Sequence, residues 1–334
     1  MTATFPHRHA AHCESGTVAN LLRHHGLDLS EPMVFGLAGG LSFAWLPFLR
    51  IQEMPLIAYR VPPRAIIRGA ARALGVRFHV ERFRSVAAGE ARLDALLDQG
   101  RAVGLQTSVY WLPYFPEDMR FHFNAHNLVV YGREGDDYLI SDPVGEHPVR
   151  CHRDDLRRAR FARGMLAPRG SLYFPAAPAA GPAAAVPNPT AIHRAIRRVA
   201  FRMLAPLPIF GAGGIRGLGR ALARLDPAAP DSLRLVGHVV RMQEEIGTGG
   251  AGFRFLYAAF LQEAAHAGAA PVLAEQAERL LEIGDAWRAF ALAAARMVKG
   301  RDPFAPAALG ALLEALAARE RAFFGDLRAS LPRC

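Results

Sequence analysis

The chain contains 334 residues, which is long enough for two domains, and its 51% hydrophobic and 21% charged residues exclude a disordered protein. No apolar run reaches the ~20 residues that a membrane-spanning helix needs, so we expect no transmembrane segment. The formal net charge of +10 favours either an acidic or phosphate-bearing partner or an arginine-rich genome, and no motif indicates nucleic-acid binding.

Residues 1–175 mix helical and strand periodicities and therefore predict an α+β domain. In chain order we expect a helix at 16–24, a Gly-rich loop at 35–43, a helix at 64–74, a strand at 76–80, a helix at 91–98, strands at 102–109, 127–131 and 138–141, a helix at 154–162 and a strand at 170–174. The acidic, glycine-containing segment between the second and third of these central strands predicts a hairpin turn.

The composition changes after residue 175. Residues 176–190 are dominated by proline and alanine and show no periodicity, so we expect a linker there. Residues 191–334 have apolar side chains at helical spacing and no strand-like alternation, which predicts an all-α domain. Two Gly-rich segments, 211–219 and 247–252, are expected to interrupt its helices; the second lacks the lysine and the preceding strand of a nucleotide-binding loop.

Three polar residues of the first domain form a candidate catalytic group. Cys13 stands at the start of a predicted helix, where the macrodipole favours a thiolate and free backbone N–H groups can bind an oxyanion. His126 opens one strand of the predicted hairpin and Asp142 closes the other, so antiparallel pairing would bring them together if both face the same way. A thiol, its base and the group that orients the base predict acyl-transfer chemistry on a thioester or amide.

Each of these residues also has a structural explanation. Cys13 by itself is typical of a small buried hydrophobe, although its neighbours are polar. His126 suits a histidine bonded to the backbone, and Asp142 suits the start of a turn before a proline. The three cysteines are an odd number and their spacing is not that of metal ligands. The N-terminal residues lack the apolar segment that a secretory signal contains. We therefore expect a reduced, cytoplasmic protein with no disulfide framework and no metal site.

Residues 12–47 (HCESGTVANLLRHHGLDLSEPMVFGLAGGLSFAWLP) resemble the N-terminal domain of the butirosin biosynthesis protein H (BtrH) acyltransferase family. The segment VYWLPY at 109–114 and the strand that His126 opens share this resemblance, and residues 247–265 (GTGGAGFRFLYAAFLQEAA) are similar to the helical domain of that family. The resemblance implies a papain-like α+β domain, akin to bacteriocin-processing cysteine peptidases, followed by an all-α domain. It also implies transfer of an acyl or aminoacyl group from an acyl carrier protein to an amine.

The resemblance implies a role for individual residues as well. Cys13 would be the nucleophile, His126 the base and Asp142 the residue that orients the base. Related peptidases place an oxyanion-binding glutamine six residues before the cysteine, where this chain has a histidine. The candidate oxyanion or auxiliary residues are His7, His12 and Glu14.

Substrate-binding candidates are two glycines and two tyrosines, Gly39, Gly40, Tyr110 and Tyr114. Glycines let backbone approach a ligand and aromatic rings can line an acyl or acceptor pocket, although a tight loop and core packing explain them equally. The expected partners are an acyl carrier protein and a small-molecule amine, in specialised metabolite or lipid biosynthesis, with no cofactor other than the carrier's phosphopantetheine. The alternatives are a hydrolase with the same triad (thioesterase, amidase or peptidase) and a non-catalytic module that binds a carrier protein or a membrane surface.

Overall fold

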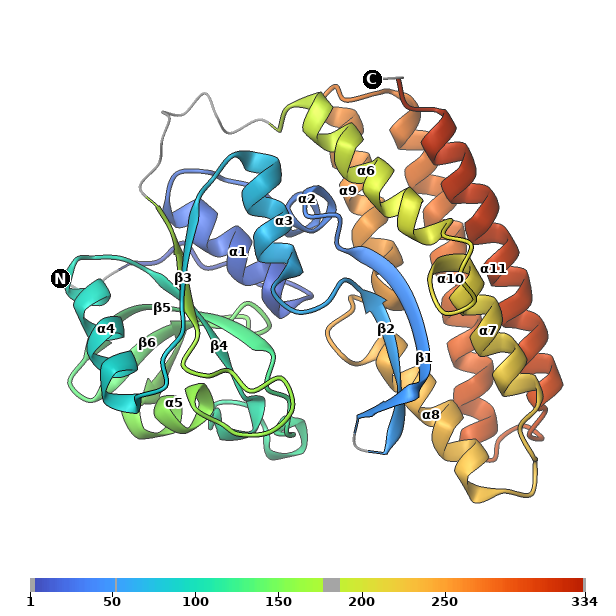
Figure 1. The fold of residues 1–334 in the computed structure, drawn as a ribbon, viewed down its shortest axis with the longest axis horizontal. Coiled ribbons are helices and arrows are strands. Elements are labelled where there is room, and N and C mark those ends of the chain that lie inside the picture. Colours follow the sequence, from blue (N-terminus) through green and yellow to red (C-terminus); the bar gives the residue numbers. More distant parts are fainter. Residues whose placement is uncertain (1–3, 52, 177–186, 333–334) are drawn as a thin grey trace. The chain divides into compact units, whose positions relative to one another are not determined.

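The chain folds into two compact units. The computed structural model describes residues 4–51, 53–176 and 187–332. The first unit consists of Met1–Val34 and Ile66–Val186, and the second of Phe35–Ala65 and Pro187–Cys334. A β-sheet with helices forms the first unit, whereas the second is mainly helical (Figure 1). The predicted fold class, α+β with a helical C-terminal region, is confirmed.

The first unit is built on a six-stranded antiparallel sheet with the order β3-β8-β4-β5-β6-β7. Its strands are β3 (Phe78–Glu81), β4 (Val103–Thr107), β5 (His126–Glu134), β6 (Asp137–Ser141), β7 (Val149–His152) and β8 (Leu172–Pro175). The predicted hairpin is present between β5 and β6, and Gly135 takes the positive φ of 60° that its turn requires. Only β7 was not predicted, because its four residues show too short an alternation.

Helices cover the sheet of the first unit. α4 (Val86–Asp98) and α5 (Arg153–Arg160) enclose an apolar core with side chains of the central strands, such as Leu105, Leu128 and Ile140. α1 (Cys13–His24) packs against β4, β5 and β8 on the side away from α4 and α5 (Figure 1). The other helices before residue 176 are α2 (Glu31–Leu37), α3 (Ala65–Leu74), η1 (Val109–Trp111) and η2 (Glu117–Met119).

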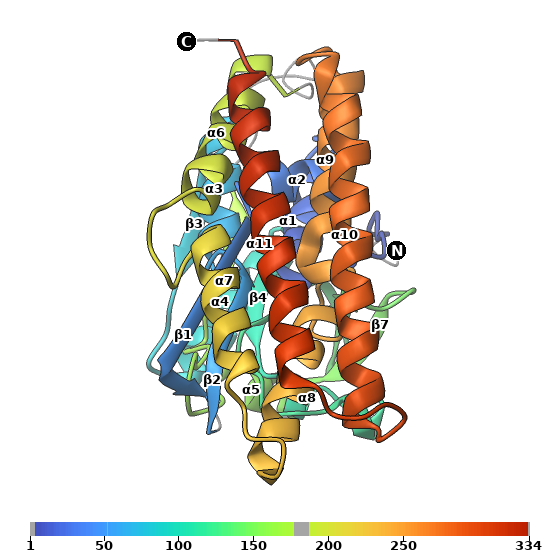
Figure 2. The same cartoon turned by 90° about the vertical axis from the view of Figure 1, so that its right-hand side faces the viewer.

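The second unit is a bundle in which the long helices α10 and α11 lie side by side (Figure 2). Its helices are α6 (Pro189–Met203), α7 (Gly211–Ala223), α8 (Pro230–Glu244), η4 (Ala251–Phe253), α9 (Arg254–His266), α10 (Val272–Val298) and α11 (Pro306–Ala329). Leu280, Ile283 and Trp287 recur at helical spacing along α10, and all three are buried. The helical periodicity that predicted this region therefore corresponds to its core.

A β-hairpin also belongs to the second unit. β1 (Leu41–Ile51) pairs with β2 (Met54–Arg60), and the buried Tyr59 ring lies 5.6 Å from the Trp287 ring, centre to centre. The sequence predicted a Gly-rich turn or loop at 35–43, and the turn is present only at 38–40, since α2 runs to Leu37 and β1 starts at Leu41. Alternate apolar residues at the start of β1 are the strand signal that the glycines obscured.

The first predicted helix interruption, at 211–219, is also wrong, because these residues form most of α7. Glycine here serves close helix packing: a Cβ built on Gly310 of α11 would lie 2.8 Å from the carbonyl oxygen of Gly219 in α7. The second predicted interruption is present, since Gly250 and Gly252 have positive φ values of 85° and 55° between α8 and α9.

The compact units differ from the predicted domains at one segment. Residues 35–65 lie inside the predicted first domain, 1–175, but pack with the helical unit. Most of the predicted linker at 176–190 lies outside the described residues, so the predicted boundaries stay a prediction. Among the helices of the described ranges, none is long and apolar enough to cross a membrane.

Candidate active site

Cys13 is the first residue of α1 and its side chain is buried. The preceding residue, His12, is the N-cap, and its ring nitrogen Nδ1 lies 3.3 Å from the backbone N of Ser15. The Cys13 N–H belongs to the first turn, whose N–H groups have no partner within the helix. An oxygen that gains negative charge beside the thiol would find a hydrogen-bond donor there.

His126 and Asp142 lie in direct contact at the end of the β5–β6 hairpin. His126 Nε2 is 2.7 Å from Asp142 Oδ2, and the two residues are only 4% and 1% exposed. His126 begins β5 and Asp142 follows β6, so the antiparallel register places both at one end of the sheet. The Cys13 side chain acts on the protonation of the same imidazole. Because Nε2 holds Asp142, Nδ1 is the ring nitrogen left for the thiol.

The charge of Asp142 controls the protonation of His126. Burial by itself lowers the pKa of His126, but the Asp142 carboxylate and the Cys13 side chain together raise this pKa to about 10. An imidazolium therefore persists next to the thiol at neutral pH. An adjacent cation stabilises a thiolate, so the arrangement suits a thiolate–imidazolium pair.

Tyr114 and Phe115 complete the surroundings of the His126–Asp142 pair. The Tyr114 hydroxyl donates to Asp142 Oδ2 at 2.8 Å, and the Val144 N–H donates to Oδ1 at 3.2 Å. Phe115 meets the His126 ring edge-on, with 5.5 Å between ring centres and an interplanar angle of 83°. A substrate-binding role for Tyr114 stays a prediction.

Besides the N-cap His12, the other two candidate auxiliary residues also have structural partners. His7 Nε2 donates to the Gly145 carbonyl at 3.1 Å, and its Nδ1 lies 2.7 Å from Ser141 Oγ. The carbonyl can only accept, so the neutral ring carries its proton on Nε2 and accepts at Nδ1. Glu14 Oε1 accepts the Ile66 N–H in the first turn of α3 at 3.1 Å. These contacts anchor the fold, and an oxyanion role for either residue stays a prediction.

Glu31 is a contact of the site that sequence reasoning missed. Its carboxylate accepts the N–H of Ala11 at 2.8 Å, the N–H of His12 at 2.9 Å and the hydroxyl of Ser15 at 2.9 Å. Burial raises the pKa of Glu31, although these hydrogen bonds act in the opposite direction. The carboxylate therefore fixes the segment that leads into Cys13. The sequence signal was weak because an acidic residue also suits the first turn of α2.

The other substrate-binding candidates also have structural contacts of their own. Gly39 and Gly40 belong to the second unit, where Arg202 donates to the Gly39 carbonyl and a Cβ on Gly40 would lie 2.5 Å from the Phe35 ring. Tyr110 is 39% exposed and stacks on His122 at 4.0 Å. A substrate-binding role for these residues stays a prediction. In the described part of the chain, no group of His, Cys, Asp and Glu side chains is arranged to hold a metal ion.

Comparison with known families covers most of the chain. Residues 12–143 match the family described as "Butirosin biosynthesis protein H, N-terminal", and residues 154–327 match the family described as "Domain of unknown function (DUF4872)". The second match spans more than half of the chain. The chain belongs to the DUF4872 family. In this member, the BtrH match contains Cys13, His126 and Asp142, and it confirms the BtrH-like resemblance seen in the sequence.

Similarity to individual proteins is low for this DUF4872 member. No curated protein is similar enough to count as a match. Among solved structures, a Bacillus anthracis chain described as a C39-like peptidase is 14% identical with a TM-score of 0.37. The similarity covers 52% of this chain and 96% of that one.

Proposed function

We propose that the protein is an acyltransferase that moves an acyl or aminoacyl group from an acyl-carrier-protein thioester, through an acyl-S-Cys13 intermediate, to an amine. The observation that carries this proposal is the buried His126–Asp142 pair, 2.7 Å apart, whose imidazole is also influenced by the Cys13 side chain. A thiol, an imidazole and a carboxylate in this order form a nucleophile, a general acid–base and its orienting group.

The geometry supports a two-step reaction. The Cys13 thiolate attacks the thioester carbonyl, and the oxyanion forms next to the Cys13 N–H. The intermediate collapses to acyl-S-Cys13, and the His126 imidazolium gives its proton to the departing carrier thiolate. An amine then attacks the acyl-enzyme, His126 takes the amine proton, and Cys13 leaves as the thiolate when the amide forms. Asp142 holds the imidazole in place during both steps and stabilises its positive form.

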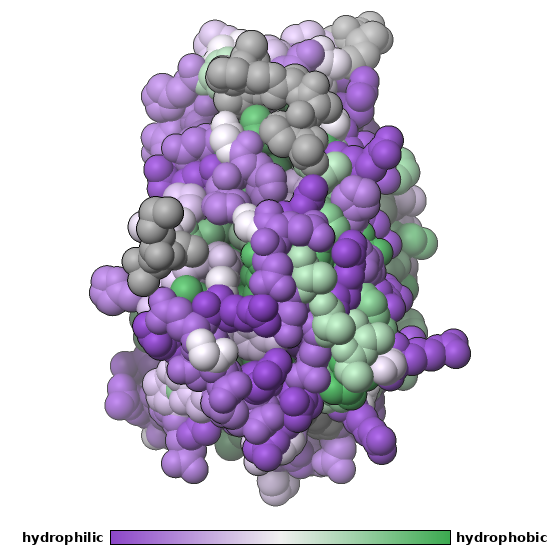
Figure 3. All heavy atoms as spheres, turned by 90° about the vertical axis from the view of Figure 1, so that its left-hand side faces the viewer, coloured by the Kyte–Doolittle hydropathy of each residue, from purple (hydrophilic) through white to green (hydrophobic). Residues whose placement is uncertain are grey.

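The choice of a carrier-bound thioester is supported by the family and by charge. The match to the butirosin biosynthesis protein H family associates the N-terminal region with biosynthetic chemistry. The net charge of +10 favours association with an acidic carrier protein and with the phosphate of its phosphopantetheine arm. Figure 3 shows that hydrophilic residues cover most of the face that it displays. We place the reaction in the cytoplasm, with no cofactor besides the carrier's own arm.

Intact-protein mass spectrometry tests the proposal. Incubation with an acyl-phosphopantetheine thioester is expected to add one acyl group to the wild type and none to Cys13→Ala. The matched control is Cys151→Ala, which should retain the adduct, because Cys151 is buried and burial raises its pKa to about 12. An adduct that survives in Cys13→Ala would contradict the nucleophile assignment.

Addition of amines to the loaded enzyme separates transfer from hydrolysis. A transferase yields an amide in the presence of its acceptor and releases acid slowly without it. Rapid release of free acid, with no amide from any amine, would instead assign the same triad to a thioesterase, amidase or peptidase. An unreactive Cys13 combined with salt-sensitive binding of carrier protein would indicate a non-catalytic binding module.

A further inference from the structure

Asp142 Oδ2 receives two hydrogen bonds rather than one. His126 Nε2 lies 2.7 Å from this oxygen, and the Tyr114 hydroxyl lies 2.8 Å from it. Burial and the Asp142 charge raise the pKa of Tyr114 well above its usual value, so the phenol stays protonated and can only donate to the carboxylate. Tyr114 therefore competes directly with His126 for the same carboxylate oxygen.

The acceptor capacity of Asp142 is largely filled by protein groups. Oδ1 accepts the Val144 N–H at 3.2 Å, and the residue is 1% exposed. The other titratable groups that act on this cluster are Cys13 on His126, Cys151 on Tyr114, and the His7 ring on Asp142. With little solvent to screen it, each donor to the carboxylate reduces the negative charge that His126 experiences.

We propose that Tyr114 is a positioning residue that fixes the Asp142 carboxylate and limits the proton affinity of His126. This inference rests on the proposed function only for its catalytic meaning, since the hydrogen bonds exist whatever the reaction is. A general acid–base works best when its pKa is close to the working pH. Without the Tyr114 hydrogen bond, the full charge of Asp142 would hold the proton on His126 too firmly. Tyr114 keeps His126 able to both give and take that proton.

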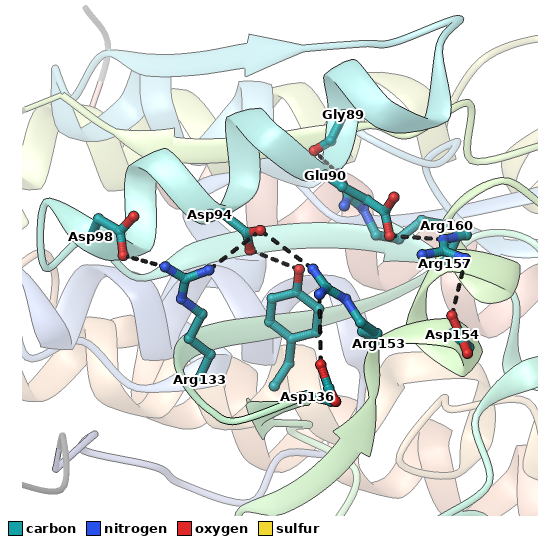
Figure 4. A network of polar contacts seen from close by, with 11 residues as sticks. Gly89, Glu90, Asp94, Asp98, Arg133, Asp136, Arg153, Asp154, Arg157 and Arg160 are labelled. Carbon is teal, nitrogen blue, oxygen red and sulfur yellow. Dashed lines mark hydrogen bonds and ion pairs between the residues drawn. The ribbon is translucent and has the colours of Figure 1, made fainter.

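The chain contains a matched comparison for this contact. Tyr138 of β6 also donates its hydroxyl to a carboxylate, that of the partly buried Asp94, whose Oδ1 lies at the same distance of 2.8 Å. Figure 4 shows Asp94 on α4 between Arg133 and Arg153, in a polar network separate from the residues of the candidate site. Tyr114→Phe and Tyr138→Phe thus remove the same chemical group from the same unit.

The experiment measures the pKa of His126 by NMR of histidine-labelled protein, with His126→Gln to assign its signal. Tyr114→Phe is expected to raise the proton affinity of His126 about three- to tenfold, the size of one typical hydrogen bond, whereas Tyr138→Phe leaves it unchanged. Equal values in wild type and Tyr114→Phe would overturn the inference, as would an equal shift in both variants.

A second variant guards against simple misfolding. Site-specific 3-fluorotyrosine at position 114 keeps the ring and strengthens its hydroxyl as a donor, so it should lower the proton affinity of His126; a rise or no change would contradict the inference. Acyl loading of the wild type is measured in parallel. A wild type that does not load rejects the proposed function alone, while a wild type that loads with no NMR shift rejects only the role of Tyr114.

Discussion

Asp142 supplies the negative charge that keeps a buried histidine protonated. Asp142→Asn keeps the shape of the side chain but removes that charge, so the pKa of His126 should fall, because burial is then opposed only by the Cys13 side chain. We expect acyl loading of Cys13 at neutral pH to fall about 10²-fold or more, by analogy with the loss of the orienting carboxylate in serine triads. The matched control is Asp94→Asn, which breaks the Figure 4 network and should load normally.

The same charge predicts a pH dependence of stability. The pKa of folded His126 is raised from 6.5 to about 10, so its ion pair with Asp142 contributes fully below pH 6.5 and is lost as the pH rises through 10. The difference in free energy of unfolding between wild type and Asp142→Asn should be largest near pH 6 and shrink toward pH 10. Urea unfolding at four pH values measures it, and a constant difference would contradict the ion pair.

His7 is expected to behave in the opposite way. Burial lowers the pKa of this histidine, and its two ring nitrogens suit the neutral form, which accepts from Ser141 and donates to Gly145. Its stabilising contribution is therefore present above pH 6.5 and is lost as the pH falls through the lower, folded pKa. His7→Gln cannot titrate, so its unfolding temperature should fall less than that of the wild type between pH 7.5 and pH 5. Parallel acid sensitivity would contradict this.

At the residue scale, the sequence predicts identities better than contacts. Cys13, His126 and Asp142 are recognisable because helix start, strand start and strand end are local signals that the chain order carries. The contacts of Tyr114 and Glu31 cannot be recognised in this way. Tyr114 lies 28 positions from Asp142, and Glu31 lies up to 20 positions from its partners, across loops whose path no periodicity predicts. The sequence therefore suggested a substrate pocket for Tyr114 but gave no sign of its hydrogen bond to Asp142.

At the element scale, glycine was the main source of error. Gly-rich segments predict a helix interruption when only propensity is considered, but α7 is helical, and its Gly219 allows α11 to approach closely. The prediction failed because packing contacts with other parts of the chain offset the intrinsic cost of glycine in a helix. These contacts cannot be read from the local sequence, since the partner helix is remote in sequence. The β1–β2 hairpin was missed in the same way, since its buried face contacts residues more than 200 positions later.

Two glycines of α11 test this explanation. A Cβ on Gly310 would lie 2.6 Å from Ala223 Cβ, whereas nothing lies within 4 Å of a Cβ on Gly325. Gly310→Ala should therefore destabilise the second unit by about 1–3 kcal/mol, and Gly325→Ala should stabilise it by up to about 1 kcal/mol. Thermal unfolding followed by circular dichroism compares them. Stabilisation by both substitutions would show that the close approach of α7 and α11 does not matter.

At the scale of the whole molecule, the chain passes between its two compact units three times, after Val34, Ala65 and Val186. Composition shows only the last of these passages, because proline and alanine mark it, while the first two occur within ordinary secondary structure. A boundary drawn from sequence alone therefore assigns the β1–β2 hairpin to the N-terminal domain. The hairpin's buried aromatic residues, Phe43, Trp45 and Tyr59, instead belong to the core of the helical unit.

Fragments of the chain can distinguish the domain boundary predicted from the sequence from the division into compact units. Residues 187–332 alone lack the hairpin, so the face around Trp287 loses its contacts with Phe43 and Tyr59 and is expected to be exposed. This fragment should unfold without a sharp transition and bind a hydrophobic dye. Residues 35–65 joined to it through a Gly/Ser linker of about 15 residues, which spans roughly 20 Å, should restore one cooperative transition. A cooperative transition in residues 187–332 alone would show that the hairpin is dispensable, and that the helical region is a domain by itself.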